Sequence, residues 1–183
     1  MLARRLAPIA LALIATNAFA QPPAPAPAAQ PAPARGGTGP AVPASRGPSM
    51  ALALEAVQKA VETCAANGNK VSAIVVDSGG FTKAQITADG TDPRSVDFVL
   101  RKAYTAALLK MTPGEAARLL RTDTALADKV KADPRLLPIN AGGFPIKLGE
   151  ETIGGIAASG APTPAGDDVC AQAGLEAIKA RLK

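Results

Sequence analysis

Two periodicities that follow each other in residues 71–113 place the strongest limit on what this chain can fold into. A β-branched run ends at a Gly79-Gly80 turn, and residues 81–87 alternate again, which is typical of two strands joined as a hairpin. Asp92-Pro93 then supplies an N-cap with proline at the first helical position. The apolar residues that follow recur at helical spacings: Val96, Val99, Leu100, Ala103, Ala106, Ala107 and Met111. The stretch therefore predicts a hairpin followed by a helix.

Helices are also predicted before and after this stretch. The first begins at Met50 and ends at Asn67-Gly68, a pattern typical of a helix C-terminus. After the helix of residues 93–111, Thr112 and Glu115 form a capping box for a second helical piece, and a further short helix ends before residue 133. The expected buried stripe of the first helix consists of Met50, Leu54, Val57, Val61 and Cys64.

The second half of the chain adds strands and a last helix. Residues 136–139 form a short apolar segment, and residues 144–148 and 152–159 read as two strands around a turn. Asp167 or Asp168 is expected to cap a helix that ends near residue 182. Because the strands come in consecutive pairs with helices between and outside them, we predict an α+β fold with a mainly antiparallel sheet of about five strands.

Two glycine pairs lie beside these strands. Gly142-Gly143 predicts a loop with positive φ or a close backbone approach, and Gly154-Gly155 predicts a bulge or an element packed on the strand. Neither pair has the spacing of a dinucleotide-binding or phosphate-binding loop. A structural role in a turn or bulge is therefore expected for these glycines before a role in ligand binding.

The N-terminal residues differ in composition from the rest. Arg4 and Arg5, an apolar run and an A-x-A site before Gln21 make residues 1–20 a secretory signal peptide, so we expect an exported protein, periplasmic or secreted. In residues 21–48, 17 of 28 residues are Pro or Ala, which predicts a disordered linker. Residues 49–183 form the globular domain, and no segment is long and apolar enough for a membrane span.

Charge and residue types exclude several kinds of site. The chain has 20 basic and 15 acidic residues, but four of the arginines precede residue 49, so the domain is nearly neutral and no nucleic-acid partner is expected. Histidine is absent, which excludes His-based acid–base catalysis and typical zinc sites. Arg101, Lys102 and Tyr104 lie off the apolar stripe of their helix. They are its candidate functional side chains.

Cys64 and Cys170 are the two cysteines. An even count in an exported protein favours a disulfide, and both residues fall on apolar helix stripes, on the first and last helices. The alternative is two buried free thiols.

Five motifs in order resemble a known family. They are residues 75–80 (VVDSGG), 102–106 (KAYTA), 142–146 (GGFPI), 153–161 (IGGIAASGA) and 171–175 (AQAGL), and together they span the domain. In these motifs the chain resembles the GlcG/HbpS-like haem-binding family, related in fold to the C-terminal domain of PduO-type corrinoid adenosyltransferases. The resemblance implies a profilin-like α+β domain that assembles into homo-oligomers, often octamers, and binds haem or related small ligands.

The resemblance also implies a ligand site. It places the haem iron at Thr112. In a chain without histidine the candidate iron ligands are Tyr104, Met111, Lys102 and Thr112. The expected pocket lies between residues 102–112 and the loop of residues 142–145. Its expected residues are Lys102, Tyr104, Thr112, Gly142, Gly143 and Phe144.

Three functional hypotheses remain open at this point. The leading one is an exported, non-catalytic protein that binds a small molecule, with haem or another tetrapyrrole as the first candidate. The second is an enzyme or accessory factor in small hydroxy-acid metabolism, whose chemistry would rest on Lys102, Tyr104 or Asp77. The third is a structural oligomer tethered by its Pro/Ala segment.

Overall fold

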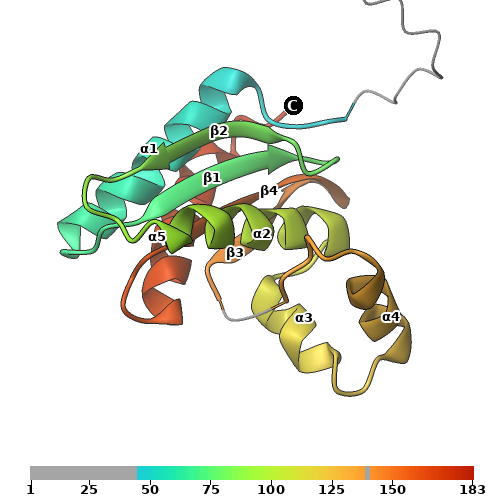
Figure 1. Cartoon of the computed structure of the whole chain (residues 1–183). Helices are drawn as coiled ribbons and strands as arrows, with labels where there is room; N and C mark the ends of the chain where they lie inside the picture. Colours follow the sequence, from blue (N-terminus) through green and yellow to red (C-terminus); the bar gives the residue numbers. More distant parts are fainter. Residues whose placement is uncertain (1–44, 139–140) are drawn as a thin grey trace, which may run out of the picture. The chain divides into compact units, whose positions relative to one another are not determined.

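The computed structural model describes residues 45–138 and 141–183; the expected signal peptide and most of the expected linker lie outside them. The described chain has helices on both sides of one antiparallel sheet, whose strand order is β2-β1-β4-β3 (Figure 1). The helices are α1 (Met50–Ala66), α2 (Arg94–Leu109), α3 (Pro113–Leu119), α4 (Thr124–Ala132) and α5 (Pro164–Lys179). The strands are β1 (Ser72–Asp77), β2 (Thr82–Thr87), β3 (Gly143–Leu148) and β4 (Glu151–Ser159). The α+β prediction is confirmed.

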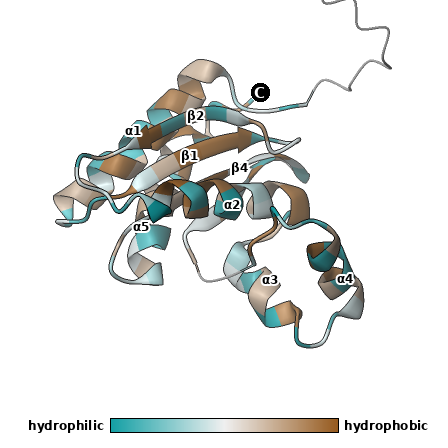
Figure 2. Ribbon diagram, viewed as in Figure 1, coloured by the Kyte–Doolittle hydropathy of each residue, from teal (hydrophilic) through white to brown (hydrophobic). Residues whose placement is uncertain are grey.

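The sheet is covered on both faces. α1 and α5 pack on one face and α2 on the other, with α3 beside the end of α2. β1 shows this arrangement, because Ala73 and Val75 join the cluster under α1 whereas Ile74 and Val76 join the cluster under α2. Figure 2 accordingly shows apolar colouring along β1, while edge strand β2 carries hydrophilic residues. Every helix of the described residues is too short or too polar to cross a membrane.

The sheet has four strands in the described residues, so the prediction of about five is wrong. The difference lies in the apolar segment after α4, where residues 136–138 form no strand. The backbone N–H of Leu136 is hydrogen-bonded to the carbonyl of Asp133, and that of Leu137 to Oγ1 of Thr105 at 2.7 Å. Pro138 has no N–H to offer to a neighbouring strand. Leu136 is buried by packing beside Tyr104, outside the sheet.

α1 buries only part of the stripe that the sequence predicts. Met50 and Leu54 are 72% and 49% exposed, whereas Ala53, Ala56 and Ala60 are buried with Val57 and Cys64. The reason is that α1 lies close against α5: a Cβ added at Gly174 would come within 2.4 Å of the carbonyl oxygen of Ala56. Only small side chains fit such a contact.

The disulfide between Cys64 and Cys170 is present at the end of this helix pair, with a Cα–Cα distance of 5.4 Å. It joins residues 106 positions apart and therefore ties the start of the domain to its last helix.

α2 lies equally close to the other face of the sheet. A Cβ added at Gly155 of β4 would come within 2.2 Å of the carbonyl oxygen of Ala103, so the glycine allows the helix to approach the strand backbone. This agrees with the expectation that an element packs on that strand. α2 is also covered on its flanks, and Lys102 and Tyr104, expected off its apolar side, are only 4% and 6% exposed.

The last part of the expected linker is held against the domain. Residues 45–48 run past the end of β1, where Ser45 donates a hydrogen bond to Asp77. The backbones of Arg46 and Ser78 are also linked, since the N–H of Ser78 donates to the carbonyl of Arg46 at 2.8 Å. The ordered domain thus includes these residues.

Candidate functional site

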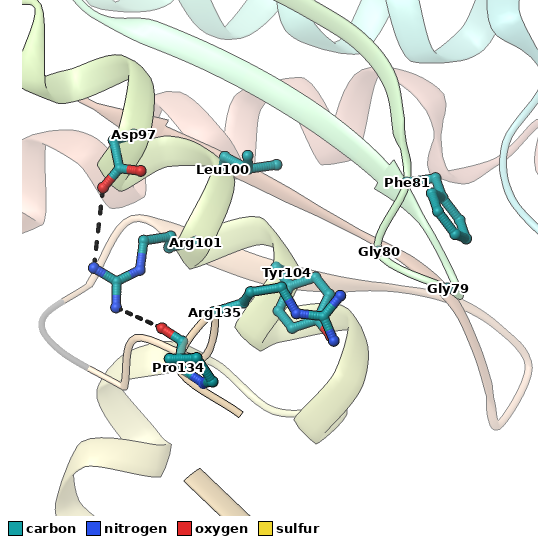
Figure 3. A pocket seen from close by; sticks show the side chains of 9 residues that line it. All are labelled: Gly79, Gly80, Phe81, Asp97, Leu100, Arg101, Tyr104, Pro134 and Arg135. Atoms are coloured by element: carbon teal, nitrogen blue, oxygen red, sulfur yellow. Dashed lines mark hydrogen bonds and ion pairs between the residues drawn. The ribbon is translucent and has the colours of Figure 1, made fainter. Parts of the chain in front are cut away.

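Three hollows lie along α2 and the loops at its ends. The Tyr104 pocket, about 470 Å³, is lined by Gly79, Gly80, Phe81, Asp97, Leu100, Arg101, Tyr104, Pro134 and Arg135 (Figure 3). The Thr112 hollow, about 310 Å³, is lined by Thr112, Gly114, Glu115, Arg118, Ala141, Phe144 and Asp168. The Ser159 pocket, about 390 Å³, is lined by residues 92, 94, 95, 98, 102, 159–164 and 167. The three share no lining residue, so the expected site residues are divided among separate places.

The Tyr104 pocket is mainly apolar. Phe81 and Leu100 line it and are 64% and 38% exposed, which is unusual for large apolar side chains. The ring of Tyr104 lies beneath the hairpin turn, where a Cβ added at Gly80 would come within 2.2 Å of the ring. The turn therefore needs glycine both for its φ of 81° and for this contact.

One carboxylate, that of Asp133, joins two lining residues of this pocket. The hydroxyl of Tyr104 donates to Asp133 at 2.8 Å, and Arg135 donates to both oxygens of the same carboxylate at 2.9 and 2.7 Å. The hydrogen bonds from Arg135 hold the pKa of Asp133 well below its usual range. Burial, with the hydrogen bond to Asp133 and its charge, raises the pKa of Tyr104 to about 12. The tyrosine is therefore a neutral phenol at physiological pH.

Two arginines bring positive charge to the same pocket. Arg101 donates to the carbonyl of Pro134 at 2.9 Å and lies 3.9 Å from Asp97, a loose contact with an exposed carboxylate (Figure 3). The guanidinium carbon of Arg135 lies 4.4 Å from the centre of the Tyr104 ring. The pocket therefore combines an apolar, partly aromatic wall with two guanidinium groups that can bind carboxylates.

The Thr112 hollow contains two of the expected site residues. Thr112 caps α3, since its Oγ1 accepts the N–H of Glu115 at 3.1 Å, and Phe144 enters from β3. Glu115 and Asp168 add two carboxylates to the lining, and Arg118 one guanidinium. A threonine hydroxyl has a second lone pair, so the cap does not by itself prevent Thr112 from binding a ligand.

The remaining expected residues form a buried ion pair and its supporting loop. Nζ of Lys102 lies 2.8 Å from Asp167, and both side chains are less than a tenth exposed. Gly142, with φ of 104°, passes beside this pair, because an added Cβ would lie 2.8 Å from Nζ of Lys102. Gly143 lies against Pro113 and the carbonyl of Lys102. These glycines hold a tight loop over the ion pair.

The expected caps of α5 are wrong. Thr163 caps the helix, accepting the N–H of Gly166 at 3.2 Å, whereas Asp167 is the partner of Lys102 and Asp168 accepts the N–H of Gly142 at 2.6 Å. Both aspartates lie one turn into the helix and point back to other elements. Sequence reasoning gave Arg135 no role, and the only available signal was its place next to Asp133-Pro134, where α4 ends.

Similarity to known proteins identifies the family. The family model described as haem degrading protein HbpS-like matches residues 49–176. A double mutant of HbpS from Streptomyces reticuli is 35% identical, with a TM-score of 0.66, over 83% of this chain and 99% of that chain. The comparison with curated proteins found no match.

Two more distant structures show the fold alone. The ORFY protein of Klebsiella pneumoniae is 23% identical over 79% of this chain and all of its own, with a TM-score of 0.66. A complex described as PduOC with haem is 22% identical over 70% of this chain and 91% of its own, with a TM-score of 0.62. The family match and the HbpS similarity together identify the chain as a member of the HbpS-like family of haem-degrading proteins.

Proposed function

We propose that this chain is an exported protein that binds haem or a related tetrapyrrole in the Tyr104 pocket and does not transform it. The family is described as haem-degrading, and one structural relative, PduOC, is a complex with haem. The observation that carries the proposal is the combination of an apolar hollow of about 470 Å³ with two arginines in its lining. A porphyrin offers a broad apolar face and two carboxylates, which match these two features.

The Thr112 hollow fits such a ligand less well. At about 310 Å³ it is at the lower end of ligand-pocket sizes, roughly 300–1,000 Å³. Its carboxylates, Glu115 and Asp168, would repel the carboxylates of a porphyrin. The Tyr104 pocket has Asp97 in its lining and Asp133 beside it, and each of these carboxylates is paired with an arginine of the lining, Arg101 or Arg135.

The pocket fits the macrocycle better than it fits the iron. The chain has no histidine. Tyr104, whose pKa is about 12, keeps its proton and donates a hydrogen bond to Asp133. Haem would supply a redox-active iron, but a neutral phenol is a weak ligand for it. Phe81 and Leu100 would contact the face of the porphyrin, and Arg101 and Arg135 would bind its carboxylates.

Titration with hemin and with metal-free protoporphyrin tests this proposal. Because the contacts are made to the macrocycle, both compounds should bind at one defined stoichiometry, with affinities within about tenfold of each other. Arg101→Gln should weaken both by roughly tenfold, the effect of losing one charge-assisted hydrogen bond. Arg121→Gln, the same change at an exposed position outside all three hollows, is the control. If neither hemin nor metal-free protoporphyrin binds saturably, the proposal is wrong.

Export and self-association belong to the same proposal. The disulfide supports export, since disulfides persist in oxidising compartments. Three large apolar side chains outside the Tyr104 pocket, Met50, Leu54 and Val169, are between 49% and 72% exposed, which supports burial against further copies of the chain. Intact mass of the exported protein and light scattering after gel filtration test these two points. A retained N-terminus would contradict the first, and a monomer at micromolar concentration would contradict the second.

A further inference from the structure

The Ser159 pocket, defined above, has no role in the proposed haem binding. It lies where the first turns of α2 and α5 meet the end of β4. The lining contains Ser95 at the start of α2, Ser159 at the end of β4, and Thr163 and Pro164 at the start of α5. Two helix N-termini therefore open on one hollow of about 390 Å³.

Two buried hydroxyl groups have no partner there. Ser95 and Ser159 are 5% and 6% exposed, and neither hydroxyl has a hydrogen-bond partner in residues 45–138 and 141–183. Among these residues, the one fully enclosed side-chain polar atom without a partner is Oγ1 of Thr152. The two serine oxygens are therefore open to the hollow that they line. Hydroxyl groups that face such a hollow are completed there by water or by a ligand.

Gly160 brings the two serines to one wall. Its φ of 129° is a conformation that other residues rarely adopt, and a Cβ added to it would lie 3.3 Å from Oγ of Ser95. Ser159 is the preceding residue on β4. The glycine thus lets the end of β4 pass directly beside the first turn of α2.

The fixed charges of the pocket are already paired, and the remaining donors favour an anion. Asp92 is paired with Arg94 at 2.6 Å, and Asp167 is paired with Lys102 and accepts the N–H of Ala161 at 2.9 Å. Each carboxylate is therefore neutralised by its own cation. Each helix N-terminus adds a partial positive charge of about half an elementary charge. The Arg94 side chain, 81% exposed, can still reach a ligand.

We propose that the Ser159 pocket binds a small oxyanion, held by the hydroxyls of Ser95 and Ser159, by Arg94 and by the two helix N-termini. The required chemistry is a compact group of acceptor oxygens with one or two negative charges, which a phosphate or a small carboxylate provides. Water alone could satisfy the hydroxyls, but an anion gains more than a neutral water molecule does from the partial positive charge of the two helix ends.

Amide resonances of the full chain, labelled with ¹⁵N, test the proposal. The protein is titrated with inorganic phosphate and, separately, with acetate, while sodium chloride keeps the ionic strength constant. We expect saturable shifts at Ser95 and Gly160 with at least one of the two, and the comparison decides between phosphate and carboxylate. If neither anion produces shifts beyond those of chloride, the proposal is wrong.

Variants separate a site from general charge attraction. Ser159→Ala and Arg94→Gln should each weaken binding by about tenfold. Arg121→Gln makes the same charge change at an exposed position outside the pocket and should leave the affinity unchanged. If Arg94→Gln and Arg121→Gln weaken anion binding equally, the binding is an adventitious effect of net charge and the proposed site is wrong. Hemin binding serves as the internal check, because the Tyr104 pocket shares no residue with this one and should be unaffected.

Discussion

The guanidinium of Arg135 lies over the ring of Tyr104, with its carbon 4.4 Å from the ring centre, and Asp133 is hydrogen-bonded to both side chains. Hydrogen bonds within the chain thus hold Tyr104 and Arg135, two lining residues of the Tyr104 pocket, in place. The arrangement joins α2 to the segment after α4, two elements that the sequence does not obviously bring together. The contact also determines the ionisation of the tyrosine, which can be measured directly.

The ionisation of Tyr104 should occur well above the usual pH. Burial and the Asp133 carboxylate raise its pKa to about 12 in the folded protein, against about 10 in an unfolded chain. This contribution to stability is complete below pH 10 and is lost as the pH rises toward 12. The chain has one tyrosine and no tryptophan, so the ultraviolet absorbance of the phenolate reports this residue alone. A midpoint near 10 in the folded protein, equal to that in denaturant, would contradict the described contacts.

The buried pair of Lys102 and Asp167 should be strongly coupled. Lys102→Met leaves the Asp167 carboxylate buried without its cation, and we expect a loss of about 3–5 kcal/mol in the free energy of unfolding. Asp167→Asn should be destabilising for the converse reason. The double variant should lose clearly less than the sum of the two, as measured by urea denaturation. Strictly additive effects would mean that the pair, 2.8 Å apart, contributes no coupling energy.

The disulfide should contribute a large part of the stability. It closes a loop of 106 residues, for which the chain-entropy model gives about 4–5 kcal/mol. We expect urea unfolding of a Cys64→Ala, Cys170→Ala double variant to have a midpoint well below that of the oxidised parent. The reduced parent is the matched control and should behave as the double variant does. Two titratable thiols in the denatured, non-reduced exported protein would show that the bond does not form.

The order of elements and their class could be predicted because each is encoded locally. The hairpin, α2 and the Thr112 cap of α3 follow from alternation, helical spacing and capping residues within a few positions. The pairing of Cys64 with Cys170 needed one further assumption, that the first and last helices are neighbours.

The features that were mispredicted depend on contacts between distant segments. The stripe that α1 buries is decided by the close approach of α5 at Gly174, which favours alanine over Met50 and Leu54. The aspartates of α5 were expected to be caps because their local sequence fits that role. Asp167 instead meets Lys102, 65 residues away in the chain, and no periodicity reports such a contact.

The expected ligand residues were chosen because they lie in family motifs, but the structure places them in separate hollows. Tyr104 and Lys102 are two residues apart on α2 and therefore point to different sides of the helix. One lines the Tyr104 pocket and the other the Ser159 pocket. Motif positions alone could not separate the two hollows.

Close packing of α2 on the sheet should make Gly155 intolerant of a side chain. In Gly155→Ala the new Cβ would lie 2.2 Å from the carbonyl oxygen of Ala103, so the helix must move, and we expect a loss of about 1–3 kcal/mol. Gly68→Ala is the control, because nothing lies within 4 Å of an added Cβ there and only its φ of 74° is unfavourable. A smaller loss at Gly155 than at Gly68 would show that α2 does not lie as close to β4 as described.

The location of the tetrapyrrole can be tested by blocking each hollow in turn. Leu100→Glu places a carboxylate in the wall of the Tyr104 pocket, where it would repel the porphyrin carboxylates and shorten the apolar wall. Leu119→Glu makes the same change at a similarly exposed leucine of α3 that lines none of the three hollows, so it controls for charge and for general effects on folding. Thr112→Val removes the hydroxyl oxygen from the Thr112 hollow.

Hemin titration of these three variants beside the parent, followed by the Soret absorbance, is the most direct measurement of the central claim. Leu100→Glu should weaken hemin binding by more than about tenfold, as expected when a charge is introduced against an apolar ligand face. Leu119→Glu and Thr112→Val should bind as the parent does. Loss of binding in Thr112→Val with full binding in Leu100→Glu would contradict the assignment and place the ligand at the Thr112 hollow.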